Sequence, residues 1–176
     1  MMSHPKHIII TGPTNSGKTT MLYALCSRLD SAGYAIGGVV QVLPLPNQEK
    51  REWILSDQGT GEVRLLLSME EHSDWKKFGR FWYDPQTFVW AENQIIQFMA
   101  TSDYIIFDEI GPIEMQGTGF HEIYKKVLKS FHGTVISVIR DNLLDQVCDT
   151  YRVKRDKALI LSVDAPREEE LGKVIH

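Results

Sequence analysis

The sequence predicts an α/β fold of three layers, in which helices cover both faces of a mainly parallel sheet. Four short apolar runs, rich in Ile and Val, alternate along the chain with longer helical stretches. Runs of this length suit the buried strands of a parallel sheet. Strands that alternate with helices need crossover connections, which place helices on both faces. We expect core strands at His7–Thr11, Tyr104–Asp108, Thr134–Ile139 and Ala158–Val163.

Five stretches are expected to be helical. In one of them, residues 87–99, apolar side chains recur every three or four positions, as on one face of an amphipathic helix. The expected helices are Lys18–Ser31, Thr87–Met99, Gly119–Ser130, Leu143–Tyr151 and Pro166–Val174.

The stretch from residue 35 to residue 68 follows a different pattern. Ala35–Val42 is a strand candidate, and the Pro-rich segment Pro44–Gln48 interrupts it. Arg51–Asp57 and Glu62–Ser68 follow, joined by Gln58-Gly59-Thr60-Gly61, which is typical of a hairpin. We interpret this stretch as an antiparallel extension of the sheet, inserted after the first strand and helix.

Composition places the chain among ordinary globular proteins. Its 176 residues are 43% hydrophobic and 24% charged, and this length suits a single domain over residues 1–176. A net charge of -4 argues against a dedicated nucleic-acid binder, which usually has a basic face. Only two cysteines occur, Cys26 and Cys148, and the six histidines show no zinc-like spacing with them. With no signal peptide or membrane span recognised, we expect a soluble, cytoplasmic protein.

Residues 12–19 match the phosphate-loop (Walker A) pattern at every fixed position. The match follows an Ile-rich strand and opens a helix, as this motif requires. Gly12 and Gly17 let the backbone turn tightly, so that consecutive N–H groups face an anion. The helix that follows adds the positive end of its dipole. The predicted nucleotide-binding residues are Gly12, Pro13, Thr14, Asn15, Ser16, Gly17, Lys18, Thr19 and Thr20.

The side chains at the end of this loop have separate expected roles. Lys18 should reach the β- and γ-phosphates, Thr19 should offer its hydroxyl to Mg²⁺, and Thr20 should contact the α-phosphate. The acidic strand end, Walker B, completes the site, because Asp108 suits the second Mg²⁺-associated group. Glu109, the next residue, is placed to orient and deprotonate a water that attacks the γ-phosphate.

The segment that follows this strand carries a family resemblance. Asp108-Glu109-Ile110-Gly111-Pro112-Ile113-Glu114-Met115 resembles the extended acidic motif of the cancer-related nucleoside-triphosphatase family. Those small P-loop enzymes hydrolyse ATP, GTP and other nucleoside triphosphates. Gly37–Val40, Phe78-Gly79 and Ile139-Arg140-Asp141 are weaker points of similarity. The resemblance implies a P-loop NTPase fold of the additional-strand (RecA-like) class.

One segment departs from the family pattern. Gln41-Val42-Leu43-Pro44-Leu45-Pro46 stands where the family usually has Thr-Glu-Glu, so recognition of a base or sugar by that strand is not carried over. We therefore expect a divergent member.

In the additional-strand class, strand 134–139 lies between the phosphate-loop strand and the acidic strand. Arg140 then points at the γ-phosphate, where it could stabilise transition-state charge. The alternative is a surface ion pair with Asp141. Glu114 either holds the loop after Asp108 or positions Arg140. The predicted catalytic residues are therefore Glu109, Lys18 and Arg140, and the predicted metal-binding residues are Thr19 and Asp108.

The segment Trp75–Trp90 contains seven aromatic side chains. They either form a hydrophobic cluster under a long loop or supply a ring that stacks on a nucleobase. Lys76, Lys77 and Arg80 beside them are either solvated or contact the phosphates of a second substrate.

The favoured function is Mg²⁺-dependent hydrolysis of a nucleoside triphosphate, with a protein partner as an open possibility. A nucleotide or small-molecule kinase and a nucleotide-binding adaptor with negligible turnover are the alternatives. Asp108–Gly111 also fits the D-x-x-G of GTPases, but Val153–Asp156 lacks the Asn of the guanine-reading motif. The sequence therefore does not select between ATP and GTP.

Overall fold

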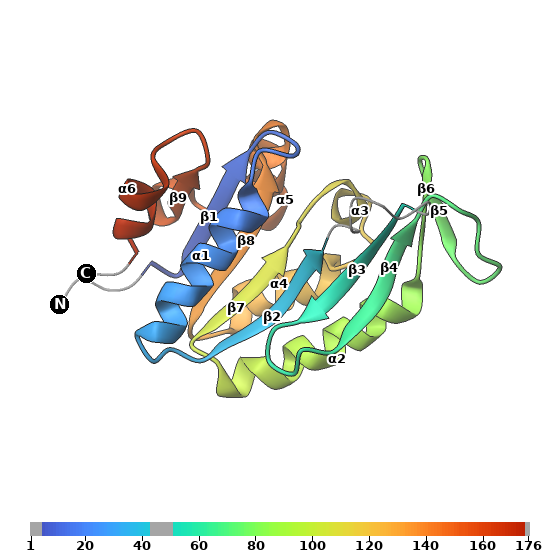
Figure 1. Ribbon diagram of the computed structural model, residues 1–176, viewed down its shortest axis with the longest axis horizontal. Coiled ribbons are helices and arrows are strands. Elements are labelled where there is room, and N and C mark those ends of the chain that lie inside the picture. Colours follow the sequence, from blue (N-terminus) through green and yellow to red (C-terminus); the bar gives the residue numbers. More distant parts are fainter. Residues whose placement is uncertain (1–4, 43–50, 175–176) are drawn as a thin grey trace.

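The computed structural model describes residues 5–42 and 51–174, and these residues form a nine-stranded sheet with helices on both faces (Figure 1). The strands are β1 (His7–Gly12), β2 (Ile36–Val42), β3 (Glu52–Asp57), β4 (Val63–Ser68), β5 (Lys76–Phe78), β6 (Phe81–Tyr83), β7 (Tyr104–Asp108), β8 (Thr134–Arg140) and β9 (Leu159–Ser162). The helices are α1 (Lys18–Ser31), α2 (Pro85–Thr101), α3 (Pro112–Met115), α4 (His121–Ser130), α5 (Leu144–Tyr151) and α6 (Arg167–Gly172), with 3₁₀ turns at Asp141–Leu143 and Arg155–Lys157.

The strand order is β5-β6-β4-β3-β2-β7-β8-β1-β9. The five strands β2, β7, β8, β1 and β9 run parallel to one another, whereas β3, β4, β6 and β5 pair antiparallel, with β3 joined to the edge of β2. β8 lies between β1 and β7, which is the strand order expected for the additional-strand class of P-loop NTPases. The predicted three-layer α/β fold is confirmed.

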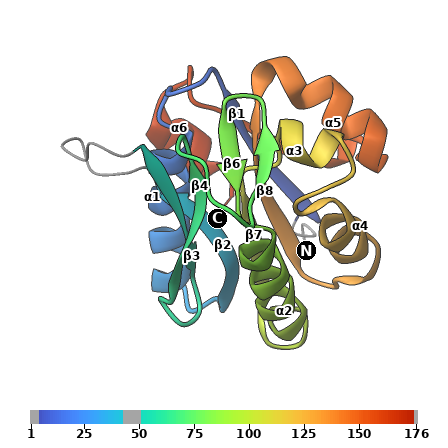
Figure 2. The same ribbon diagram turned by 90° about the vertical axis from the view of Figure 1, so that its right-hand side faces the viewer.

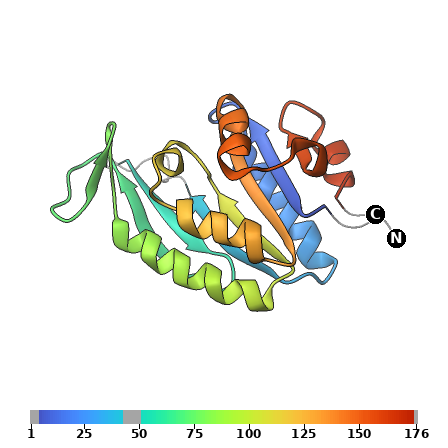
Figure 3. The same ribbon diagram turned by 180° about the vertical axis from the view of Figure 1, so that it is seen from behind.

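Helices form the two outer layers. α1 and α6 cover one face of the sheet, and α2, α4 and α5 cover the other, as Figures 1 and 3 show from opposite sides. The alternation of side chains along a strand divides the core between these layers. Ile8 and Ile10 pack beneath α1, while Ile9 between them packs in the cluster of the opposite face, and all three are fully buried. None of the helices in the described ranges is both long and apolar enough to cross a membrane.

Most expected elements are present close to their expected bounds. α1 has the predicted bounds, and the β3–β4 hairpin forms as predicted. One prediction is wrong: the antiparallel extension does not include residues 35–42. β2 pairs in parallel with β7, and only its other edge pairs antiparallel, with β3. The antiparallel part therefore begins at β3. The expected interruption at Pro44–Gln48 lies outside the described residues.

The aromatic segment is more ordered than a cluster under a long loop. β5 and β6 form a hairpin that adds two strands to the edge of the sheet through β4 (Figure 2). Gly79 lies in the turn with φ 57°, a left-handed conformation that favours glycine. Tyr83 and Phe88 are buried in the core and contact each other edge to face. The hairpin thus leads into α2 and reaches past the main body of the sheet.

Candidate active site

The loop between β1 and α1 has the backbone of a phosphate-binding loop. Asn15 and Gly17 adopt left-handed conformations with φ 57° and 92°, and Gly17 is the N-cap of α1. Gly12 is enclosed, because a Cβ atom there would lie 2.2 Å from Cγ2 of Val163. Only a glycine fits at that point without displacing its neighbours.

Lys18 begins α1 and points back over this loop. Its residue is buried, and its Nζ donates a hydrogen bond to the carbonyl of Pro13. Burial lowers the pKa of the ammonium, and the carboxylates of Glu109 and Asp108 oppose this shift. The hydroxyl of Ser16 donates a hydrogen bond to the same carbonyl at 2.7 Å. The ammonium is thus held inside the curve of the loop, where phosphate oxygens would bind.

The end of β7 presents Asp108 to α1. The hydroxyl of Thr19 donates to Oδ2 of Asp108 at 3.2 Å. Burial, with the nearby charge of Glu109, raises the pKa of Asp108 to about 7, although hydrogen bonds from Thr19 and the backbone of Gln41 act against this. A hydroxyl and a carboxylate side by side are oxygen donors of the kind that Mg²⁺ takes, together with phosphate oxygens. The two predicted metal-binding side chains therefore lie together.

Glu109 and Arg140 meet across the ends of β7 and β8. Nε of Arg140 lies 2.8 Å from Oε1 of Glu109, an ion pair whose N–H is not aligned for a hydrogen bond. The strand register places the two residues close together, because β8 pairs with both neighbours at this end of the sheet. Asp108 of β7 pairs with Val138, and Gly12 of β1 pairs with Arg140. The alternative partner, Asp141, instead accepts the backbone N–H of Asn142. Both candidate catalytic groups therefore reach the end of the phosphate loop.

Glu114 holds the loop that follows Asp108. Its two carboxylate oxygens accept the backbone N–H groups of Gly111 at 2.9 Å and Phe120 at 3.1 Å. Its residue is 4% exposed, and burial raises the pKa of the carboxyl to about 7 against the effect of these hydrogen bonds. Of the two roles expected for Glu114, the contacts favour holding the loop.

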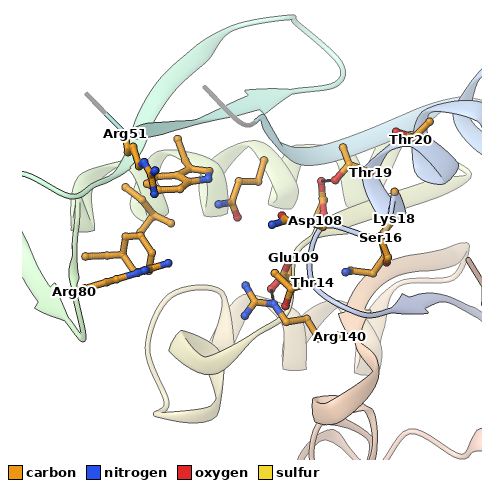
Figure 4. A pocket seen from close by; sticks show the side chains of 16 residues that line it. Thr14, Ser16, Lys18, Thr19, Thr20, Arg51, Arg80, Asp108, Glu109 and Arg140 are labelled. Atoms are coloured by element: carbon orange, nitrogen blue, oxygen red, sulfur yellow. Dashed lines mark hydrogen bonds and ion pairs between the residues drawn. The ribbon is translucent and has the colours of Figure 1, made fainter. Parts of the chain in front are cut away.

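These groups face a cavity of about 700 Å³ (Figure 4). The phosphate loop and the acidic strand end form one side of it, and side chains of β2, β3, β4 and the β5–β6 hairpin form the other. All predicted site residues except Gly12 and Pro13 line it directly. The lining residues that sequence reasoning did not assign to the site are Gln41, Arg51, Trp53 and Leu67, while Arg80 and Phe81 come from the aromatic segment whose role was left open.

A phosphate loop after the first core strand, an acidic strand two places away and β8 between them define a P-loop nucleoside-triphosphatase. Comparison with known proteins agrees. The chain matches the model of the NTPase family over residues 7–175. It is 30% identical over 137 residues to "Nucleoside-triphosphatase THEP1" of Methanothermobacter thermautotrophicus, covering 77% of this chain and 78% of that protein.

Two solved structures share the fold. The crystal structure of THEP1 from Aquifex aeolicus superposes with a TM-score of 0.70 at 18% identity, covering 97% of this chain and 99% of that one. The solution structure of a human cancer-related nucleoside triphosphatase superposes with a TM-score of 0.73 at 16% identity, covering 97% and 95%. The chain belongs to the NTPase family, and the low identities fit a divergent member, as its motifs predicted.

Proposed function

We propose that this protein hydrolyses nucleoside triphosphates to the diphosphate and phosphate, with Mg²⁺. The observation that carries the proposal is the convergence of Lys18, the Thr19–Asp108 pair and the Glu109–Arg140 pair on one cavity. Each group has a part in phosphoryl transfer, and each comes from a different segment of the chain. The named activity of the THEP1 relatives supports the same reaction.

In the proposed reaction, the phosphate-loop amides and Lys18 bind the β- and γ-phosphates. Thr19 and Asp108 would hold Mg²⁺, which when bound neutralises charge on those phosphates. Glu109 accepts a proton from a water whose oxygen attacks the γ-phosphorus, and the bond to the bridging β-phosphate oxygen breaks. Lys18 and Arg140 stabilise the charge that spreads over the phosphoryl oxygens.

The ion pair between Glu109 and Arg140 is compatible with these roles. A guanidinium has five N–H donors, so Arg140 can contact a phosphate oxygen while another of its donors still faces the carboxylate. Both side chains are partly exposed to the cavity, at 22% for Glu109 and 36% for Arg140. Arg140 can thus hold the carboxylate beside the position of the attacking water.

We further propose broad use of ATP and GTP in the cytoplasm by a single domain over residues 1–176. Nucleic acid and membranes are not expected partners, and a protein that speeds turnover would be compatible with the site. The net charge of -4 supports the expectation that nucleic acid is not a partner.

The test is phosphate release from ATP, GTP, CTP and UTP with Mg²⁺, alongside nucleotide binding. Glu109→Gln should lower kcat by about 10²–10⁴-fold and keep binding. Lys18→Ala should lose both, and EDTA should stop the reaction. Glu122→Gln and Lys125→Ala, an exposed pair on α4, are matched controls that should change nothing. Nucleotide binding without any release by the wild type would refute hydrolysis by the isolated protein.

A further inference from the structure

The wall of the cavity that faces the phosphate loop carries two arginines and two aromatic rings. Arg51 directly precedes β3 and Trp53 lies within it, while Arg80 and Phe81 come from the β5–β6 hairpin. The rings of Trp53 and Phe81 meet edge to face, with centroids 5.2 Å apart. The guanidinium carbon of Arg80 lies 5.0 Å from the centre of the Phe81 ring. We call these four residues the far wall.

Within the described residues, no carboxylate pairs with the two arginines of the far wall. Neither Arg51 nor Arg80 forms an ion pair with a carboxylate of residues 5–42 or 51–174, and both residues are exposed. Other arginines are paired in that part of the chain, for example Arg64 with Glu62. The far wall therefore presents two guanidinium groups to the cavity that no side chain of residues 5–42 or 51–174 pairs with.

The far wall lies at the end of the cavity opposite the expected position of the nucleoside. This step rests on the proposed function, in which Thr20 marks the α-phosphate and Glu109 marks the γ-phosphate. In Figure 4, Thr20 lies at one end of the cavity, Asp108 and Glu109 lie in the middle, and Arg51 and Arg80 lie at the opposite end. The nucleoside follows the α-phosphate, so it leaves toward Thr20 and away from the arginines. The far wall thus faces the γ-phosphate end and has no assigned occupant.

We propose that the far wall binds a second ligand, a small aromatic molecule with a phosphate or carboxylate group, while the nucleoside triphosphate is bound. Guanidinium groups match the oxygens of phosphate and carboxylate with two N–H donors. Aromatic rings bind planar rings by stacking, and this holds for many different rings. Trp53 and Phe81 are half-buried, and both line the cavity. The whole cavity, at about 700 Å³, is within the roughly 300–1,000 Å³ usual for small-molecule sites.

The arrangement also explains why the hairpin is basic and aromatic. Its Arg80 and Phe81 lie in the cavity, whereas Lys77 of the same hairpin stacks over Trp82 and lies outside the lining. The occupant of the far wall would stand next to the γ-phosphate, at the point where the reaction takes place.

The test uses 1-naphthyl phosphate, which combines a ring with a phosphate and resembles no nucleotide. Binding is measured by calorimetry and by protein NMR, with the phosphate loop saturated by Mg²⁺ and a non-hydrolysable ATP analogue. We expect one bound probe per chain, with shifts at Trp53 and Phe81. 1-Naphthol and inorganic phosphate, tested separately, should each bind at least tenfold more weakly.

Substitutions locate the site. The double variant Arg51→Gln/Arg80→Gln should weaken binding of the probe at least tenfold and leave binding of the ATP analogue unchanged. Arg64→Gln is the matched control, because its guanidinium also lies over a ring, Trp90 at 4.8 Å, but outside the cavity. It should bind the probe as the wild type does.

Three results would overturn the inference. They are no binding of the probe beside the ATP analogue, mutual exclusion of the two, and binding that the double variant does not weaken. Mutual exclusion would mean that the far wall receives the nucleotide's own base. Phosphate release is measured on the same samples without the probe. A protein that hydrolyses but binds no probe overturns this inference alone, and one that binds the probe but does not hydrolyse overturns only the proposed function.

Discussion

Replacing Glu114 by Gln should change how the stability of the protein depends on pH. In the folded protein, burial raises the pKa of Glu114 from its ordinary 4.5 to about 7. The folded state thus holds the proton more tightly than the unfolded state, so stability falls as pH rises through this interval. Each pKa unit corresponds to about 1.4 kcal/mol, so the ionised carboxyl lowers the free energy of unfolding by about 3 kcal/mol at high pH. Gln has no such titration.

The assay is urea unfolding of both proteins at pH 5, 6, 7 and 8. At pH 5 Glu114→Gln should be the less stable protein, because the amide has one acceptor oxygen for the two N–H groups of Gly111 and Phe120, and its NH2 faces the other donor. The free energy of unfolding of Glu114→Gln relative to the wild type should then rise with pH, by about 2.5 kcal/mol between pH 5 and pH 8. Glu122→Gln, at an exposed position, is the control for removing a carboxylate. A flat difference for Glu114→Gln would refute the reasoning.

Three further results are expected. Gly12→Ala should cost about 1–3 kcal/mol of stability by urea unfolding and weaken nucleotide binding, because its Cβ would lie 2.2 Å from Val163; Gly172→Ala, with open space around it, is the control. Burial lowers the pKa of His7 from 6.5 to about 4, so unfolding measurements should show a loss of up to about 3 kcal/mol as pH falls across that window, and His7→Asn should reduce it. Arg140→Ala should lower kcat for phosphate release by about 10²–10³-fold with little effect on nucleotide binding, and an unchanged kcat would remove Arg140 from the mechanism.

The parallel core could be predicted because its signals are local. Buried strands such as β1 and β7 are unbroken apolar runs, and α1 begins directly at the end of a phosphate-loop motif with fixed spacing. The strand order followed from the class that the motifs indicated. Pairing of Glu109 with Arg140 depended on that order, since the two residues are neighbours only because β8 lies beside β7.

The far side of the cavity could not be predicted for the same reason. Arg51 and Trp53 lie at the start of the antiparallel part of the sheet, and nothing in their local sequence indicates which side chains turn toward the phosphate loop. The β5–β6 hairpin has three-residue strands, too short for a clear alternation of apolar and polar residues. The parallel pairing of β2 with β7 could not be predicted either, because the Gly-rich sequence of β2 does not distinguish a parallel partner from an antiparallel one.

The position of β8 has a consequence for how the chain folds during synthesis. Its strand inserts between β1, more than a hundred residues earlier, and β7, so the centre of the sheet cannot close until residue 140 has left the ribosome. Contacts between segments this distant in sequence form slowly, because a long loop must be ordered first. Because β1 pairs with β8 and β9, both of its edges stay without these partners until the last third of the described chain has been made. The phosphate loop is thus made early and the complete site late, because Arg140 is the last residue of β8.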